Sequence, residues 1–388
     1  MRPCAAARGG QIAGSDFERV APRRGSKYPE SVQTSEFDYE LPPERIAQEP
    51  ANPRDHSRLM VLHREEGRIG HRRFYELPEL LRPGDALILN DSRVIPAKLR
   101  ARRLPDDKPA EILLLEPAAE QDWWVLAKPA RRLKPGARAR FVPRRLPAPP
   151  LEATVLDRNE EGHRLIRFDA EEDPLRLLSF YGETPLPPYI RRPSGETPAD
   201  PVRYQTVYAK APGSVAAPTA GLHFTEPLLE RLRAAGVETA TVTLHVGLGT
   251  FAPVKTDRVE EHPMHAESFE LPASVCDAVR RARRAGGRVI AVGTTSVRAL
   301  ETAAQEQGNE LRPVRGRTRL FIRPPWEFRA TDAMITNFHL PRSTLLMLTA
   351  AFAAPGSTRG RELILRAYRE AIDRGYRFYS YGDAMLIL

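Results

Sequence analysis

Histidines occur in several loops of small and polar residues that each follow an apolar run. His223 lies in "VAAPTAGLHFT", His245 opens "HVGLGTF", and His339 lies in "TNFHLPRST". An imidazole titrates near neutral pH, so it can accept or donate a proton during a reaction. Glycine lets the backbone approach a bound molecule closely. These loops are therefore the first candidates for a site that moves protons around a small molecule.

The segment "VGTTSVR" places hydroxyl groups where a helix is expected to begin. Thr294, Thr295 and Ser296 follow the apolar run "RVIAV" after a single glycine, Gly293. Free N–H groups at a helix N-terminus attract an anion such as a carboxylate or a phosphate. The same hydroxyls can equally cap the helix, so both interpretations stay open.

The segment "EEHPMHAESFE" contains His262, His265 and Glu267, whose side chains are of the types that bind metals. Pro263 interrupts helical geometry, the HExxH pattern is absent, and no cysteine lies near in sequence. We therefore expect no metal, and proton transfer is the favoured role for these histidines, with a structural role still open for His262. A metal-dependent hydrolase remains an alternative.

Composition is typical of a water-soluble enzyme. The chain has 388 residues, of which 41% are hydrophobic and 28% are charged, and only two are cysteines. No apolar run is long enough for a membrane span, and the few cysteines suit a reducing compartment, so we expect a cytoplasmic protein. The net charge of +9 favours a polyanionic partner, but a genome biased towards arginine codons explains it equally well. A non-catalytic RNA-binding protein is thus a second alternative.

The spacing of strand-like and helix-like runs predicts an α/β fold with an inserted β-barrel. Residues 58–172 contain short β-rich runs separated by turn sequences, which favours a small antiparallel barrel. Strand and helix patterns alternate in residues 173–388, and together with residues 36–57 they predict a layered α/β domain. Residues 1–35 lack the apolar content of a core, so we expect a disordered N-terminal extension.

Ligands of open α/β sheets bind beyond the strand ends, so the loops described above are expected to meet in one cleft. The chain lacks the pattern GxxxxGK[ST], and "HVGLGT" lacks the third glycine of a dinucleotide site. The common nucleotide-binding motifs are therefore excluded as the basis of this cleft.

A series of segments in constant order, from about Phe37 to Leu388, resembles one enzyme family. The segments that carry the resemblance are "FDYELPPERIAQEP", "LNDSRVIPAKL", "GSVAAPTAGLHFT", "TLHVGLGTFAPV", "HPMHAESFE", "RVIAVGTTSVRALE", "TNFHLPRSTLLMLTAAFA" and "YRFYSYGDAMLIL". They are similar to those of the S-adenosylmethionine:tRNA ribosyltransferase-isomerases of the queuosine pathway.

The resemblance implies a reaction in which S-adenosylmethionine donates its ribosyl group. The acceptor would be 7-aminomethyl-7-deazaguanine at the wobble position of a tRNA. The products would be epoxyqueuosine in the tRNA, adenine and methionine. The resemblance implies no metal and no organic cofactor, with S-adenosylmethionine as a substrate, and we expect a monomer without a membrane association.

The implied reaction requires several proton transfers, so side chains with pKa values near the working pH are needed. The candidate catalytic residues are His223, His245, His265 and Glu267. The candidates for substrate binding are Asp91, Arg93, Thr219, Gly221, Gly247, Gly249, Thr250, Thr294, Thr295, Ser296, Arg298, Asn337, His339 and Asp383. Which histidine is the base and which the acid stays open, and Asp91 is explained equally well by a tight turn with Asn90.

Overall fold

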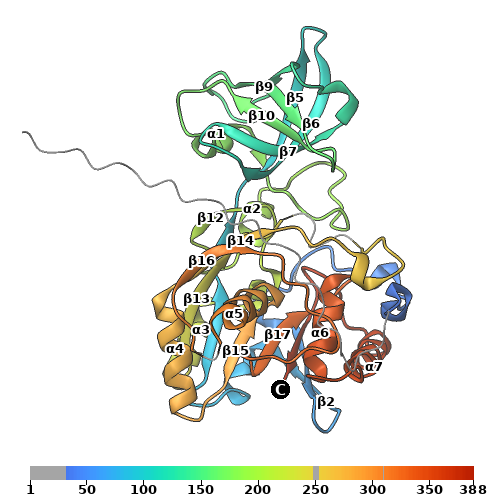
Figure 1. Ribbon diagram of the computed structural model, residues 1–388, viewed down its shortest axis with the longest axis vertical. Coiled ribbons are helices and arrows are strands. Elements are labelled where there is room, and N and C mark those ends of the chain that lie inside the picture. Colours follow the sequence, from blue (N-terminus) through green and yellow to red (C-terminus); the bar gives the residue numbers. More distant parts are fainter. Residues whose placement is uncertain (1–31, 248–252, 309) are drawn as a thin grey trace, which may run out of the picture.

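The computed structural model describes residues 32–247, 253–308 and 310–388. Figure 1 shows a small β-barrel above a larger part in which helices cover a twisted sheet. The expected fold class, a layered α/β domain with an inserted antiparallel barrel, is confirmed. None of the helices in the described residues is long and apolar enough to cross a membrane.

A nine-stranded sheet organises the larger part, in the order β16-β14-β13-β3-β15-β17-β18-β1-β2. The neighbouring strands β13, β3, β15 and β17 run parallel to one another at its centre. Parallel strands present their carboxyl ends at one edge, so the loops that follow them lie together. The strands of this sheet are β1 (Arg58–His63), β2 (Arg68–Arg73), β3 (Ala86–Asn90), β13 (Glu238–Leu244), β14 (Glu267–Leu271), β15 (Val289–Val292), β16 (Val314–Thr318), β17 (Ala333–Asn337) and β18 (Ala384–Ile387).

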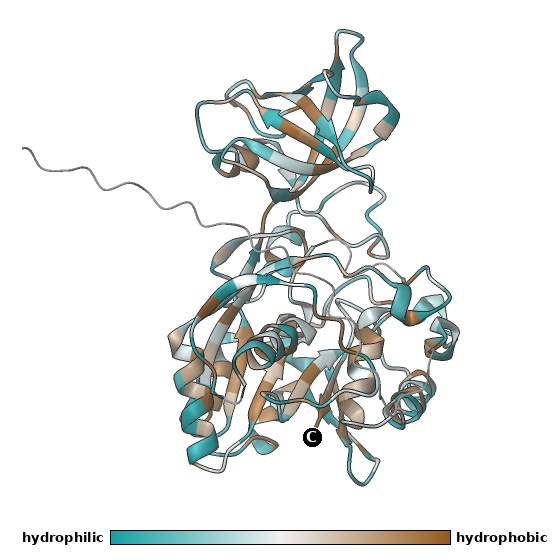
Figure 2. Cartoon of the chain, viewed as in Figure 1, coloured by the Kyte–Doolittle hydropathy of each residue, from teal (hydrophilic) through white to brown (hydrophobic). Residues whose placement is uncertain are grey.

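Helices cover both faces of this sheet, so its central strands are buried on both sides. Every residue of β3 is buried: Ala86 and Ile88 belong to the core on one face, Leu87 and Leu89 to the core on the other. Figure 2 shows these strands as the most hydrophobic part of the layer. One face packs against α4 (Ala273–Arg284), α5 (Thr294–Gln307), α6 (Thr344–Ala353) and α7 (Gly360–Asp373), the other against α3 (Glu226–Ala234) and the 3-10 helix η4 (Phe74–Glu79).

The barrel consists of strands β5 to β10, closed by pairing between β5 and β8. Alternating side chains point inward, as in β9, where Ala153 and Val155 are buried. The helix α1 (Pro174–Tyr181) adds Leu177, Leu178 and Tyr181 to the same core. The strands are β5 (Lys98–Leu104), β6 (Lys108–Pro117), β7 (Asp122–Lys128), β8 (Arg138–Phe141), β9 (Glu152–Arg158) and β10 (Arg164–Phe168).

The expected boundary of the barrel at residue 58 differs from the observed pairing. β1, β2 and β3 belong to the large sheet, and the barrel begins with β5 at Lys98. At its other end, α1 and the short strand β11 (Gly182–Glu183) join the barrel beyond residue 172. Runs of strand-forming residues at close spacing do not reveal which sheet a strand enters, because pairing partners lie far apart in sequence.

Two segments connect the barrel to the large sheet. They contain β4 (Ser92–Val94) and β12 (Ala211–Ser214), which pair in parallel below the barrel. The short helix α2 (Asp200–Arg203) lies in the return segment. This pair of strands brings Ser92 close to the loop that follows β13, since its Oγ lies 2.9 Å from Nδ1 of His245.

Residues 32–35, which we expected to belong to an N-terminal extension spanning residues 1–35, are part of the fold. Residues 1–31 lie outside the described part of the chain, but Val32 accepts a hydrogen bond from the backbone N–H of Val259 over 3.0 Å. The N–H of Thr34 donates to the carbonyl of Asp257 over 2.9 Å. Backbone pairing with residues 257–259 thus makes the last residues of the expected extension part of the fold.

Candidate active site

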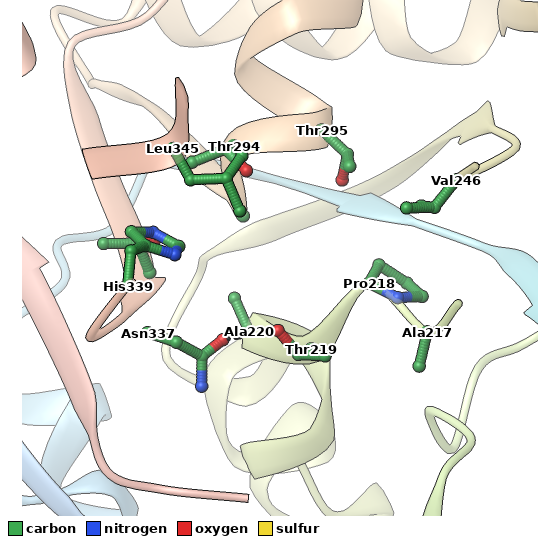
Figure 3. Close-up of a pocket in the computed structure, with 12 residues that line it drawn as sticks. Ala217, Pro218, Thr219, Ala220, Val246, Thr294, Thr295, Asn337, His339 and Leu345 are labelled. Atoms are coloured by element: carbon green, nitrogen blue, oxygen red, sulfur yellow. Dashed lines mark hydrogen bonds between the residues drawn. The ribbon is translucent and has the colours of Figure 1, made fainter. Parts of the chain in front are cut away.

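A pocket opens at the carboxyl ends of the central parallel strands. Figure 3 shows its walls: the start of α5 lies above, the 3-10 helix η6 (Thr219–His223) lies below, and His339 faces Val246 across the opening. Its lining residues come from the segments that the sequence singled out: Ala217, Pro218, Thr219, Ala220, Val246, Gly293, Thr294, Thr295, Thr336, Asn337, His339 and Leu345. The tertiary structure therefore brings together the loops after β13, β15 and β17.

The amino end of α5 forms one wall of this pocket. Gly293 precedes the helix with φ of +86°, a conformation that favours glycine, and its N–H donates to the carbonyl of Ile335 over 2.7 Å. Thr294 and Thr295 follow in the first turn and line the pocket. Ser296 does not line it, since its hydroxyl donates to the carbonyl of Val292 over 2.8 Å. The N–H groups of a first helical turn have no partner within the helix, so this wall can hold an anion.

Asn337 connects the pocket to a buried histidine. Its Oδ1 accepts a hydrogen bond from the hydroxyl of Thr219 over 2.9 Å, and its Nδ2 donates to Nε2 of His223 over 3.1 Å. Nδ1 of His223 lies 2.8 Å from Oγ of Ser57. Because Nε2 accepts, the neutral ring carries its proton on Nδ1 and donates to Ser57.

His223 does not line the pocket itself. Its ring stacks on Phe74 with 5.1 Å between ring centres, and only 4% of the residue is exposed. Burial, followed by the positive charges of Arg377 and Arg54, lowers the pKa of His223 to about 3. The imidazole is therefore neutral at neutral pH, and it supports Asn337 from behind.

His339 contributes directly to the wall of the pocket (Figure 3). Its Nε2 lies 2.8 Å from the hydroxyl of Thr336, and its backbone N–H donates to the hydroxyl of Tyr368 over 2.9 Å. Burial lowers the pKa of His339 to about 3, so this ring is also neutral at neutral pH. Its Nδ1 has no hydrogen-bond partner among the described residues, which leaves this nitrogen for a ligand.

His245 lies just after β13, one residue before Val246 of the pocket wall. Its Nδ1 lies 2.9 Å from Oγ of Ser92 in the connection to the barrel. Burial lowers the pKa of His245, and the negative charge of Asp91 partly opposes this effect. The imidazole itself does not line the pocket; it contacts the connection to the barrel, while its neighbour Val246 lines the pocket.

Glu267 and Arg298 form a buried ion pair that supports the loop after β13. Oε2 of Glu267 pairs with Nη1 of Arg298, and its Oε1 accepts the N–H of Gly247 over 2.9 Å. Arg298 also donates to the carbonyl of Leu320 over 3.0 Å. Neither charged side chain lines the pocket, so their observed contacts position Gly247. Gly249 and Thr250 lie outside the described residues.

His265 lies away from the pocket. Its side chain is 53% exposed, and its Nδ1 lies 3.5 Å from Oε1 of Glu161, in the turn between β9 and β10. His262 contacts the ring of Phe321 instead, and Glu267 pairs with Arg298. The side chains considered for a metal cluster thus have separate partners. Residues 32–247, 253–308 and 310–388 contain no group of three or more potential metal ligands.

Four further candidates for substrate binding lie outside the pocket lining. Asp91 accepts a hydrogen bond from the hydroxyl of Thr243 over 2.6 Å, and Arg93 is exposed at the barrel connection. Gly221 gives space to the hydroxyl of Tyr208, which a Cβ would approach to 2.0 Å. Asp383 is also held by protein groups, since it accepts the backbone N–H groups of Arg58 and Arg377, each over 2.8 Å.

Some residues of the site were not expected from the sequence. Asn90 is fully buried and donates from Nδ2 to the carbonyl of Leu244 over 3.0 Å and to the hydroxyl of Thr295 over 3.1 Å. It therefore joins the end of β3 to β13 and to the pocket wall, whereas its sequence position is equally consistent with a tight turn with Asp91. The lining residues that were not candidates are Ala217, Pro218, Ala220, Val246, Gly293, Thr336 and Leu345. All of them lie within or beside the segments quoted above, which was the available signal.

Comparisons with known proteins agree with this arrangement. The profile of a family described as "Queuosine biosynthesis protein" matches residues 34–387. An S-adenosylmethionine:tRNA ribosyltransferase-isomerase from Thermotoga maritima is 52% identical over 357 residues, which cover 92% of this chain and 100% of the relative. A protein of the same name from Thermus thermophilus is 55% identical over 355 residues, which cover 91% of this chain and 98% of the relative.

A solved structure is similar as well. The crystal structure of S-adenosylmethionine tRNA ribosyltransferase from Thermotoga maritima covers 91% of this chain and 100% of its own, with a TM-score of 0.51 and 43% identity. The matches extend over nearly the whole described chain, including the barrel and every wall of the pocket. The chain belongs to the queuosine biosynthesis protein family.

Proposed function

We propose that this protein transfers the ribosyl group of S-adenosylmethionine to tRNA and isomerises it. The acceptor is the aminomethyl group of 7-aminomethyl-7-deazaguanine at the wobble position. The reaction yields epoxyqueuosine in the tRNA and releases adenine and methionine. The relatives described above are named S-adenosylmethionine:tRNA ribosyltransferase-isomerases, and the chain matches them over almost their full length.

The observation that carries the proposal is the meeting of three loops in one pocket. The loops after β13, β15 and β17 each contribute to its wall, beside the amino end of α5. In this position the methionine carboxylate of the donor faces the N–H groups at Thr294 and Thr295. The ribose then lies towards Asn337 and His339, and the adenine lies towards Val246 on the opposite side.

The buried histidines suit hydrogen bonding better than proton donation. Both His223 and His339 have a pKa lowered to about 3 by burial, so their protonated forms are scarce at neutral pH. Neutral imidazoles can orient Asn337 and a bound ribose by hydrogen bonds without a competing charge. The sulfonium of the donor itself acidifies the adjacent C5′ proton, which lowers the basicity that the protein must supply.

The proposal includes tRNA and S-adenosylmethionine as substrates and no metal or organic cofactor. The net charge of +9 supports a polyanionic substrate. When cationic side chains neutralise phosphates, condensed counterions are released, and this release favours binding. We take the protein to act as a monomer in the cytoplasm, a reducing compartment that suits a chain with only two cysteines.

The direct test is to incubate the protein with S-adenosylmethionine and tRNA that carries the deazaguanine precursor. We expect adenine and methionine to appear in equal amounts, together with a tRNA that has gained the ribosyl group. The control is the same tRNA with unmodified guanine, which offers no aminomethyl group and should release no adenine. Methyl transfer without adenine release would overturn the proposal. A thermal shift with S-adenosylmethionine alone separates this enzyme from a pure RNA-binding protein, which should show none.

A further inference from the structure

A chain of hydrogen bonds links His245 to two buried serines in the connection between sheet and barrel. Nδ1 of His245 lies 2.9 Å from Oγ of Ser92, and Oγ of Ser92 shares a hydrogen bond with Oγ of Ser214. Oγ of Ser214 accepts the backbone N–H of Val246 over 2.8 Å. The chain thus begins at a backbone N–H, which can only donate, and ends at the imidazole.

The backbone N–H determines the direction of every bond in this chain. Both serines are fully buried, and among the described residues the hydroxyl of Ser214 contacts only the N–H of Val246 and the hydroxyl of Ser92. Because Ser214 already accepts from Val246, its own proton is satisfied only when it donates to Ser92. Ser92 then accepts from Ser214, and its proton points to Nδ1 of His245.

The reverse direction leaves a buried donor without an acceptor. If Nδ1 of His245 donated to Ser92, then Ser92 would donate to Ser214. The hydroxyl proton of Ser214 would then have no acceptor among the described residues, and it would also be cut off from water. A buried donor without a partner is strongly disfavoured, so the first arrangement dominates.

We propose that Ser214 and Ser92 are positioning residues that hold neutral His245 in the tautomer with its proton on Nε2. The ring then presents an N–H donor on Nε2, whereas a lone pair for proton abstraction is confined to Nδ1 and occupied by Ser92. In the reaction proposed above, on which this step rests, such a donor suits an acceptor atom on the departing purine. The role of His245 is therefore hydrogen-bond donation, not action as the base.

Gly213 provides the space in which the imidazole of His245 lies. Its φ is +144°, and a Cβ at this position would lie 2.9 Å from both Nδ1 and Cε1 of His245. The absence of a side chain lets the imidazole lie against the backbone of β12 and keeps Nδ1 within reach of Ser92. The local sequence Gly213-Ser214 thus supplies both the space for the ring and the hydroxyl that directs its proton.

The test reads the tautomer directly from the 15N chemical shifts of the imidazole nitrogens. The protein contains nine histidines, so His245→Gln serves to assign the His245 signals. Near neutral pH we expect the wild type to show a protonated Nε2 and an unprotonated Nδ1 at His245. In Ser214→Ala the direction is no longer imposed, so we expect a mixture of both tautomers. A wild-type His245 protonated on Nδ1, or a Ser214→Ala spectrum identical to the wild type, would overturn the proposal.

A matched control separates this effect from a loss of stability. The hydroxyl of Thr225 also accepts one backbone N–H, that of Leu228 over 3.3 Å, and donates onward to Asp55 over 2.9 Å. Thr225→Ala therefore removes a comparable hydroxyl without touching His245, and its His245 signals should match the wild type. Should Ser214→Ala fail to fold, the tautomer of His245 can still be read from the wild-type spectrum and from that of Ser92→Ala. Ser92→Ala removes the donor to Nδ1, so we expect a mixture of both tautomers in that variant as well.

The rate of adenine release provides the second readout. We expect Ser214→Ala to lower kcat about tenfold or more and to change its pH profile, while Thr225→Ala keeps the wild-type profile. If the wild type releases no adenine, the proposed function fails, but the tautomer result stands by itself. If adenine is released and Ser214→Ala leaves both the tautomer and kcat unchanged, the positioning role fails alone.

Discussion

The side-chain amide of Asn337 donates a hydrogen bond to the backbone carbonyl of Tyr379 over 3.3 Å. Tyr379 has a φ of +68°, a left-handed backbone conformation that residues other than glycine rarely adopt. With the amide of Asn337 reversed, two oxygens would face each other, so Tyr379 decides which end of Asn337 points to His223. Strained backbone conformations of this kind often occur at functional sites, and here the strain orients a residue of the pocket wall.

Asn337→Asp should therefore disturb both the fold and the pocket. A carboxylate cannot donate to Tyr379 or to His223, and it would be a buried charge whose hydrogen bond from Thr219 is not accompanied by a positively charged partner. We expect a loss of about 3–5 kcal/mol in the free energy of unfolding at pH 8, measured by denaturant titration. Asn159→Asp is the control, because Asn159 also contacts a histidine, His163, but in a half-exposed turn of the barrel. Equal stability of both variants would contradict the proposed orienting role of Tyr379.

The lowered pKa values of two buried histidines predict a loss of stability in mild acid. In the unfolded chain His223 and His339 titrate near 6.5, whereas burial lowers their pKa to about 3 in the fold. Between these values the unfolded state binds more protons, so their contribution is fully present above pH 6.5 and decreases as the pH falls towards 3. We expect unfolding midpoints in urea to decrease from pH 7.5 to pH 5. The decrease of the midpoint with falling pH should be smaller in His223→Gln and in His339→Gln than in the wild type, and His56→Gln on the exposed surface serves as the control substitution.

The buried pair of Glu267 and Arg298 should be far more sensitive than an exposed pair on the same strand. Glu267→Gln leaves the buried guanidinium without its charged partner, and we expect it to cost about 3–5 kcal/mol of unfolding free energy. Glu270 pairs with Arg315, whose side chain is 80% exposed, so Glu270→Gln should cost less than about 1 kcal/mol. Chemical denaturation of both variants compares them directly. A small effect of Glu267→Gln would mean that the pair is not needed to hold Gly247.

Gly213→Ala should displace the imidazole of His245. The new Cβ would meet the ring at 2.9 Å, and the residue would keep a φ that alanine disfavours. We expect a destabilisation of about 1–3 kcal/mol and a weakened contact between His245 and Ser92. Gly136→Ala is the matched control: its φ is +84°, but nothing lies within 4 Å of the added Cβ, so only backbone strain remains. A His245 spectrum that changes equally in both variants would argue against a specific contact.

Much of the site was accessible from local sequence because its loops carry distinctive residues. Thr219, Thr294, Thr295, Asn337 and His339 were candidates, and the structure places them in one pocket. Their common position follows from a general rule, since loops after neighbouring parallel strands meet at one edge of the sheet. The same reasoning placed His265 and Asp383 in the site, although both have partners elsewhere. Histidine and aspartate also occur as structural residues, and a local sequence pattern does not distinguish a structural role from a functional one.

The sequence by itself determined the class of the fold, the presence of an inserted barrel and the segments that build the pocket, because periodicity and turn residues act over short distances. Only the tertiary structure decided that β1 to β3 enter the large sheet and that Glu267 meets Arg298. It also decided which nitrogens of His223 and His245 accept hydrogen bonds. Such relations depend on the pairing of distant strands and on the satisfaction of buried polar groups, and both arise only when the whole chain has folded.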